Sequence, residues 1–547
     1  MEAIRSRTET HLHNIRSNRS EVRSIDPQHN AGDEDLLNQI GYKQELRRHY
    51  STLETFGISF SIMSLLPSIS SILPTLLESG LGGAFWSWLA ASIMITIVGI
   101  SMSMAASAIP TSGGLYYYTN YYCPDSYRVP LSFLIGCANS LGLLGGYCSI
   151  SYGFAVEVLS AVSISQDGAF EVTNGKNYGV FAATVISTMI IACLATKQAA
   201  KLQAISIYVN VFLVLLFVIA VPVGFSKHHT FNSRGMIFGD FTNARSWPVG
   251  WSVCLSLQGA VWVIGSFDSV IHCSEECKNP QKAMAWGIVG SIVACAILGV
   301  AVVAVCCACI IGGDITRILD SETGSAMAQI IYDSLGKKWA VAFMALISVG
   351  QYLMAISITI AISRQIWSFA RDDGLPIIYN WVKYVDPRVK VPVRATILAG
   401  IIALLLGLLS LINGNAGSNA LFSLAINSNS LAWMMPTLLI LLPYGRKKFI
   451  PGPFWFGKPI SYTIMLLAVL WLMFIIISST FPDNKEVDKN TMNYTVVINV
   501  GVWILSLFYY YVHGYKKYSG PRSNLDMPDY VDGSSVALMD EVLSEKA

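Results

Sequence analysis

Charged residues are scarce in this chain. Asp, Glu, Lys and Arg make up 13% of its 547 residues, against about 25% in a typical soluble protein. Apolar residues make up 53%. This balance excludes an ordinary soluble globular protein and indicates a chain that crosses a membrane several times.

Motifs for catalysis and metal binding are also missing. The sequence contains no GxSxG, Walker A or HExxH pattern, and its cysteines and histidines lack the spacing of a metal site. The eleven Cys residues are scattered, several inside apolar runs, which favours buried thiols that pack as small hydrophobic side chains. We therefore expect no enzymatic activity, no cofactor and no nucleic-acid partner.

Long apolar stretches dominate what is present. Twelve of them are long enough to cross about 30 Å of hydrocarbon. We predict an all-α integral membrane protein with a polar N-tail (1–50), a twelve-span domain (51–515) and a short C-tail (516–547). The predicted spans are 53–76, 84–109, 131–160, 178–196, 202–225, 250–276, 285–311, 325–363, 393–413, 418–442, 460–481 and 493–513.

The positive charges predict the orientation. Most of the 36 Lys and Arg residues fall in the two tails and in the loops on the same side as the tails. Because cytosolic segments near a membrane carry the excess of Lys and Arg, both termini are predicted to be cytosolic. The N-tail has no apolar signal-peptide core and is predicted to be disordered, with residues 40–46 forming a short helix at the membrane surface.

Two spans carry interruptions. In the sixth, Gly265 and Ser266 break the apolar run and Asp268 follows, a carboxylate at membrane depth. Such a charge costs several kcal/mol, with values from about 3 to above 10, so it is kept for a reason. In the first span, Pro67 removes a helix hydrogen bond. Interruptions five spans apart predict a substrate site between two inverted repeats.

Three further motifs follow the second, sixth and eighth spans. They are residues 110–118 (PTSGGLYYY), 266–280 (SFDSVIHCSEECKNP) and 363–376 (SRQIWSFARDDGLP). All three resemble signatures of the amino acid–polyamine–organocation transporter superfamily, and the chain is similar to its fungal amino acid/choline permeases. Segments such as 41–46 (GYKQEL) and 328–340 (AQIIYDSLGKKWA) resemble the fungal GABA permeases within that branch.

This resemblance implies a LeuT-type fold with broken helices 1 and 6. Its inverted repeats of five spans each cover about 53–225 and 250–442, and two peripheral helices follow at about 460–513. It also implies secondary active transport of γ-aminobutyrate (GABA) or a related amino acid or amine, with polyamines as further candidates. The proton gradient is the expected energy source, and the lipid bilayer and a small solute are the expected partners.

The two breaks supply the candidate substrate site. Half-helix N-termini offer free N–H groups to a carboxylate, and unwound carbonyls suit an amine. The alternative for Asp268 is that its side chain caps the second half-helix. The predicted substrate-binding residues are Ser64, Leu65, Pro67, Ser68, Gly265, Ser266, Phe267 and Asp268.

Titratable residues near the sixth span supply candidates for coupling and gating. Asp268 and His272 lie one turn apart, and His titrates near neutral pH, so this pair is the candidate proton site. Glu157, near the outer end of the third span, is either a solvated interface residue or a gate residue. The inner-gate candidates, with solvated loop charges as the alternative, are Glu276, Lys278, Arg364 and Arg371.

Alternatives to GABA transport stay open at this stage. A permease for choline or another quaternary amine would need an aromatic cage instead of an anion-receptive break. A nutrient-sensing transceptor with little flux is the rival from another class. The sequence leaves the vacuolar membrane and the plasma membrane as alternative locations.

Overall fold

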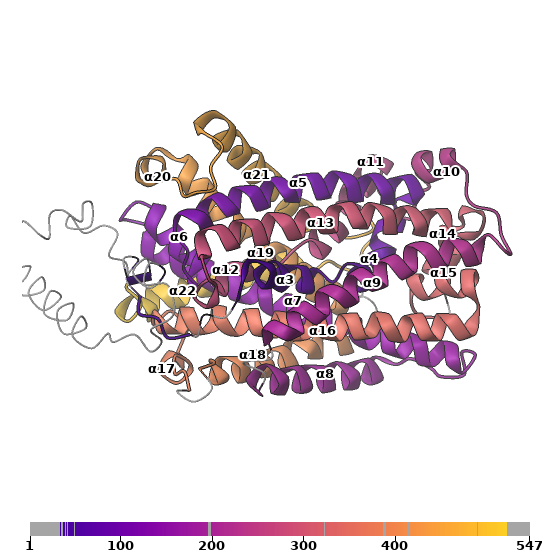
Figure 1. The fold of residues 1–547 in the computed structure, drawn as a ribbon, viewed down its shortest axis with the longest axis horizontal. Coiled ribbons are helices and arrows are strands. Elements are labelled where there is room, and N and C mark those ends of the chain that lie inside the picture. The colour runs from indigo at the N-terminus through magenta and orange to yellow at the C-terminus, as the bar shows by residue number, and fades with distance from the viewer. Residues whose placement is uncertain are drawn as a thin grey trace, which may run out of the picture.

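The computed structural model describes most of the chain between residues 33 and 521 (Figure 1). The predicted disordered N-tail lies mostly outside the described residues, as does the C-tail beyond residue 521. The described residues are 33, 37, 38, 40, 42–46, 48 and 50–521, the last without 195–198, 322, 387–389, 413–415 and 489–490.

The described part is all-helical, as predicted, and its only β pairing is an isolated bridge between Tyr50 and Cys277. The longer helices are α3 (Thr52–Met63), α4 (Leu65–Leu77), α5 (Gly80–Ala108), α7 (Arg128–Ser165), α8 (Asn174–Leu194), α9 (Ala199–Phe225), α11 (Val249–Val263), α13 (Pro280–Ala308), α15 (Ala326–Leu335), α16 (Lys337–Arg371), α18 (Val393–Gly407), α19 (Ala416–Leu441), α21 (Lys458–Ser478) and α22 (Thr495–Val512).

Short helices sit in the connections between them. They are α6 (Gly114–Tyr122), α10 (Arg234–Gly239), α12 (Ser269–His272), α14 (Ile315–Leu319), α17 (Tyr379–Val382), α20 (Pro443–Lys448) and the 3₁₀ turns Ser274–Glu276, Ile311–Gly313, Leu408–Leu411 and Gly514–Lys516.

Within the described ranges, eleven helical segments are long and apolar enough to cross a membrane, with α3 and α4 counting as one segment. The sixth predicted span, 250–276, is instead the 15-residue α11 and the four-residue α12 on either side of a break. The eighth predicted span, 325–363, divides at Gly336, whose φ of 79° ends α15 before α16 begins. The first part of this predicted span is therefore a separate helix, α15, before α16.

The long helices run along one axis of the molecule (Figure 1). At one end lie α6, α17, α20 and the described residues that precede α3, and we call this the tail end. At the opposite end, the far end, lie α10, α14 and α15. Helix α7 packs against both α16 and α19, and it therefore lies inside the bundle. Helix α5 packs against α13.

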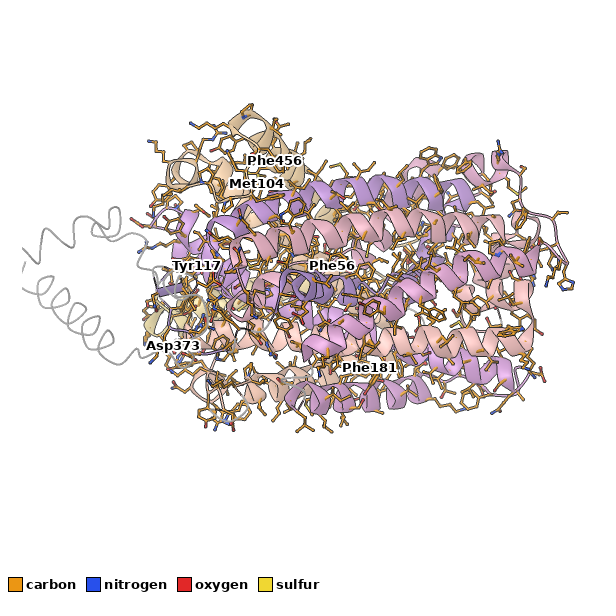
Figure 2. The ribbon with its side chains drawn as sticks, viewed as in Figure 1. Phe56, Met104, Tyr117, Phe181, Asp373 and Phe456 are labelled. Atoms are coloured by element: carbon orange, nitrogen blue, oxygen red, sulfur yellow. The ribbon has the colours of Figure 1, made fainter. Side chains whose placement is uncertain are left out.

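Close helix packing depends on glycine at particular positions. Side chains fill the spaces between the ribbons, as the stick view shows from Phe56 inside the bundle to Tyr117 at the tail end (Figure 2). Gly299 on α13 faces the fully buried ring of Trp88 on α5, and a Cβ at this position would overlap the ring. The α5–α13 contact therefore requires a residue without a side chain here.

Replacing Gly299 with Ala is expected to destabilise the fold, because overpacking a core costs about 1–3 kcal/mol. The measurement is thermal unfolding of purified protein in detergent. The matched control is Gly179→Ala on α8, where no atom lies within 4 Å of the added Cβ. We expect a lower melting temperature for the first variant only, and equal melting temperatures would contradict the α5–α13 packing.

Candidate functional site

The first helix break occurs at Ser64, three residues before the proline that the sequence suggested as its cause. Ser64 adopts a left-handed conformation (φ 33°, ψ 68°) and separates α3 from α4. Pro67 lies in the first turn of α4, where a missing N–H is tolerated. The Met63 carbonyl, which a residue with an N–H at position 67 would bond, accepts the Ser68 hydroxyl instead, at 2.6 Å.

This break leaves the start of α4 without a side-chain cap. The Ser64 hydroxyl makes no capping bond to the first turn of α4, and the N–H groups of Ser64 and Ser68 donate to the carbonyls of Phe60 and Ser64. The helix dipole at this N-terminal end of α4 favours negative charge. The anion-receptive role expected from the sequence stays a prediction.

The second break separates α11 from α12. Ser266 has a φ of 57°, and the carbonyls of Val263, Ile264 and Gly265 accept no hydrogen bond from the described residues. Unpaired carbonyls at the C-terminal end of α11 favour a positive charge. The two breaks thus present opposite polarities.

A small cavity lies against the second break. Gly265 and Ser266 line it, so two of the eight predicted substrate-binding residues reach its surface. The complete lining is Ile62, Gly146, Ile150, Val261, Trp262, Gly265, Ser266, Met354, Ala425, Ile426, Asn429 and Trp433.

The other predicted substrate residues lie beside the cavity rather than on it. The Ser64 hydroxyl donates to Asn210 Oδ1 at 2.8 Å and bonds the Gly350 carbonyl at 3.2 Å, so it links α9 and α16. Phe267 packs against Trp433 in a tilted arrangement, with ring centroids 4.5 Å apart, and so supports a cavity wall. The remaining members, all buried, are Leu65, Pro67, Ser68 and Asp268.

Asp268 belongs to a buried polar cluster on the tail-end side of the cavity. Its Oδ2 accepts from Asn139 Nδ2 at 2.8 Å and lies 3.5 Å from His272 Nε2. His272 Nδ1 lies 3.2 Å from the Ser112 carbonyl, and the Asp268 side chain makes no helix-capping bond. The capping alternative is therefore wrong, and the predicted Asp268–His272 pair is in contact.

Several residues that line the cavity were not predicted as site residues. Gly146 and Asn429 come from α7 and α19, and the Oδ1 of Asn429 and the Nε1 of Trp433 are buried without a hydrogen-bond partner. A signal was available in the third span, because Gly142 and Gly145 lie against the backbone of α19. Small residues at such spacing mark close helix contacts in membranes.

Two buried ion pairs lie at the tail end. Arg364 Nε lies 2.8 Å from Glu276 Oε1, and Arg371 forms two hydrogen bonds of 3.0 Å with Glu275. Both pairs join α16 to the segment after α12. The fourth predicted gate residue, Lys278, forms no ion pair within the described part of the chain.

The segment before α3 covers these ion pairs. The Arg371 guanidinium lies between the rings of Tyr42 and Trp367, 4.0 and 4.5 Å from their centroids. The hydroxyls of Tyr42 and Tyr116 donate to Asp372 Oδ2 at 2.8 and 2.7 Å. Residues 42–46 are not helical, so the predicted surface helix is wrong there.

Burial, together with the negative charge of Asp372, raises the pKa of Tyr42 and of Tyr116 well above the ordinary value of tyrosine. Both phenols therefore stay protonated at physiological pH and continue to donate to Asp372. The hydrogen bonds from these two hydroxyls to Asp372 therefore persist at neutral pH.

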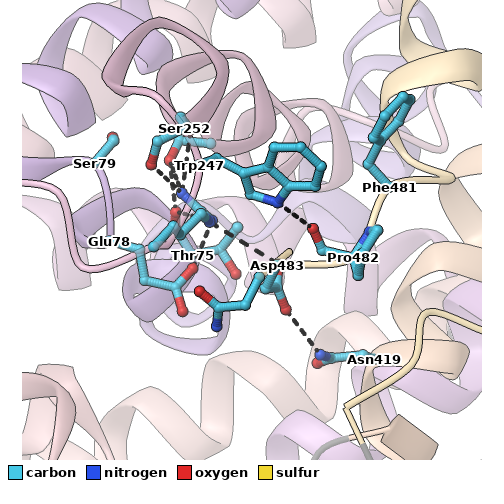
Figure 3. Close-up of polar contacts among 12 residues, drawn as sticks. Thr75, Glu78, Ser79, Trp247, Ser252, Asn419, Phe481, Pro482 and Asp483 are labelled. Atoms are coloured by element: carbon cyan, nitrogen blue, oxygen red, sulfur yellow. Dashed lines mark hydrogen bonds and ion pairs between the residues drawn. The ribbon is translucent and has the colours of Figure 1, made fainter. Parts of the chain in front are cut away.

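A second polar cluster ties the segments toward the far end. Arg245, in the loop before α11, has a buried side chain that lies 2.5 Å from Glu78 Oε2 and donates to the Thr75 carbonyl at 3.1 Å. It also donates to Ser256 Oγ at 2.9 Å. Figure 3 shows Thr75 and Glu78 of this cluster beside Asp483 and Trp247, whose indole donates to the Pro482 carbonyl at 2.9 Å.

Comparison with known proteins agrees with this architecture. The amino acid permease family model matches residues 50–502. This chain belongs to the amino acid permease family. The permease is 48% identical over 97% of its length to the GABA-specific permease of Saccharomyces cerevisiae, of which it covers 94%.

Two further relatives are more distant. An uncharacterised amino-acid permease of Schizosaccharomyces pombe is 31% identical, with 90% of each chain covered. A putative polyamine transporter of Candida albicans is 29% identical, with 92% of the permease and 93% of the relative covered. The family resemblance drawn from the motifs is confirmed, and membership indicates a transporter rather than an enzyme.

The observed ion pairs predict a specific pattern of coupling. Removing one partner of a buried pair costs about 3–5 kcal/mol, and removing the second costs less because no charge is then left unpaired. Double-mutant cycles of Glu275→Gln with Arg371→Gln, and of Glu276→Gln with Arg364→Gln, should therefore be strongly non-additive in thermal unfolding. The crossed cycle of Glu276→Gln with Arg371→Gln is the control and should be closer to additive. Stronger coupling in the crossed cycle would mean that the pairs exchange partners.

Proposed function

We propose that this permease carries GABA across a membrane, driven by the proton gradient. The observation that carries the proposal is the pair of helix breaks near one cavity, which places the uncapped N-terminal end of α4 at one break and unpaired carbonyls at the other. GABA carries a carboxylate and an ammonium group at opposite ends, so it matches both. The 48% identity to a GABA-specific permease supports the same substrate.

Each end of the substrate has candidate partners in the structure. The carboxylate binds at the N-terminal end of α4, beside Leu65, and Ser64, Pro67 and Ser68 fix the backbone there. The ammonium group binds the carbonyls around Gly265. The unpartnered Oδ1 of Asn429 is a further acceptor, and the ring of Trp433 offers a cation–π contact.

Proton coupling is assigned to Asp268 and His272. The pair is fully buried, and Asn139 holds the same carboxylate oxygen that faces the imidazole. Carboxylate and imidazole side chains both bind and release protons, and a movement of α12 would change the contact between these two.

Alternating access follows from the closed ends. The pairs Glu275–Arg371 and Glu276–Arg364 form the inner gate, and Arg245 forms the outer closure. In this proposal both termini are cytosolic, so the tail end faces the cytosol. The fold has twelve spans with α11, its break and α12 as the sixth, arranged as LeuT-type inverted repeats in the vacuolar or the plasma membrane.

The test is uptake of radiolabelled GABA into proteoliposomes under an imposed pH gradient, with choline and putrescine as competitors. We expect uptake that requires the gradient and is unaffected by choline. Competition by putrescine would extend the substrates to polyamines, in keeping with the putative polyamine transporter among the relatives. Transport of choline without GABA would overturn the substrate, and the absence of any flux would favour a transceptor.

Asp268→Asn is expected to strongly reduce gradient-driven accumulation of GABA. The amide oxygen can still accept the hydrogen bond from Asn139, but the amide binds no proton. The loss should be tenfold or more in the initial rate of driven uptake. The control is Asp320→Asn, which changes an exposed carboxylate at the end of α14. Unchanged uptake and pH dependence in Asp268→Asn would remove this residue from the coupling mechanism.

A further inference from the structure

A second carboxyl group lies deep in the protein, on the opposite side of the cavity from Asp268. Glu157 on α7 is 1% exposed, so the expectation of a solvated interface residue is wrong. Both of its carboxyl oxygens are buried without a hydrogen-bond partner. It forms no ion pair with any described residue.

The half-helix α4 covers this carboxyl group. The Ser70 hydroxyl of α4 lies beside it without completing a hydrogen bond of standard geometry. One turn away, a Cβ on Gly153 would lie 2.6 Å from Ser71 Oγ and 2.7 Å from Gln351 Nε2. Helices α4 and α16 therefore pack closely on α7 at this level and exclude water from Glu157.

The surroundings offer Glu157 no compensating charge. The neighbouring polar side chains, Ser70 and Ser71 on α4 and Gln351 on α16, do not titrate. Asp167, which forms an exposed ion pair with Lys337, is ten residues after Glu157. At 1.5 Å per helical residue this separation is about 15 Å, too far for Lys337 to pair with Glu157. An ionised carboxylate that is buried without a partner costs several kcal/mol, so the group binds a proton instead.

Opening at the far end would change this situation. The end of α4 is held to the loop before α11 by Arg245, through Thr75 and Glu78. When that contact breaks and α4 moves away from α7, water reaches Glu157 and the carboxyl group can ionise. Closure over Glu157 then requires that a proton has been bound first.

We propose that Glu157 is a proton-binding site loaded from the far side of the membrane, and that its protonation permits α4 to close over α7. This inference rests on the proposed proton-driven transport and adds a site to it. Asn139, the cavity residue Gly146 and Glu157 follow one another along α7. Asn139 and Glu157 are about 27 Å apart at 1.5 Å per residue, so the Asp268 cluster and Glu157 lie on opposite sides of the cavity.

The first experiment needs no substrate. Infrared spectra of the full-length protein in lipid should contain the carbonyl stretch of a protonated, buried carboxylic acid at neutral pH. Glu157→Gln should remove this band. The matched control, Glu171→Gln, changes an exposed carboxylate beyond the same end of α7 and should leave the band in place. Survival of the whole band in Glu157→Gln would overturn the proposal.

The second experiment uses the same variants in proteoliposomes. Gln resembles the protonated acid, so Glu157→Gln should retain exchange of external for internal GABA while losing at least tenfold in gradient-driven accumulation. Driven accumulation equal to that of the unsubstituted protein would overturn the coupling role. If the unsubstituted protein moves no GABA, the proposed substrate fails, and the infrared band still decides whether Glu157 holds a proton.

Discussion

Backbone hydrogen bonding in an apolar environment is the constraint on which the rest of this structure depends. A helix that stops inside the bundle leaves N–H and C=O groups that no water can satisfy, and such groups persist only where they line a protected cavity. The chain has two such interruptions, at Ser64 and at Gly265–Ser266. Ser68 compensates the carbonyl that Pro67 leaves open, so the first break presents a helix N-terminus while the second presents unpaired carbonyls.

Polar groups elsewhere serve these breaks by holding the half-helices in place. Arg245 fixes the far end of α4, and the pairs of Arg364 and Arg371 fix the segment that follows α12. The half-helices α4 and α12 are thus each anchored by charges at the end away from the break. Both sets of contacts are formed in this conformation.

The sequence predicted the features that depend on local chemistry. The helical class, the two interruptions and the contact of Asp268 with His272 all follow from hydropathy, residue type and helical spacing. Features that depend on how helices rotate against each other were not accessible. Arg371 pairs with Glu275, which was not among the gate candidates, and Glu157 lies under α4 rather than at an interface. A single sequence read alone does not show which face each helix turns toward the cavity. Cavity residues such as Asn429 could therefore not be identified as site residues.

The ring of Tyr42 has a consequence for the energetics of the gate. It lies on the Arg371 guanidinium, and its hydroxyl bonds Asp372, although it belongs to a segment that crosses no membrane. In the proposed transport cycle, each opening of the tail end would separate this ring from a buried cation or carry the two along together. The free energy of opening would then include a contribution from residues before the first helix, so the proposed cycle would extend beyond the helical bundle itself.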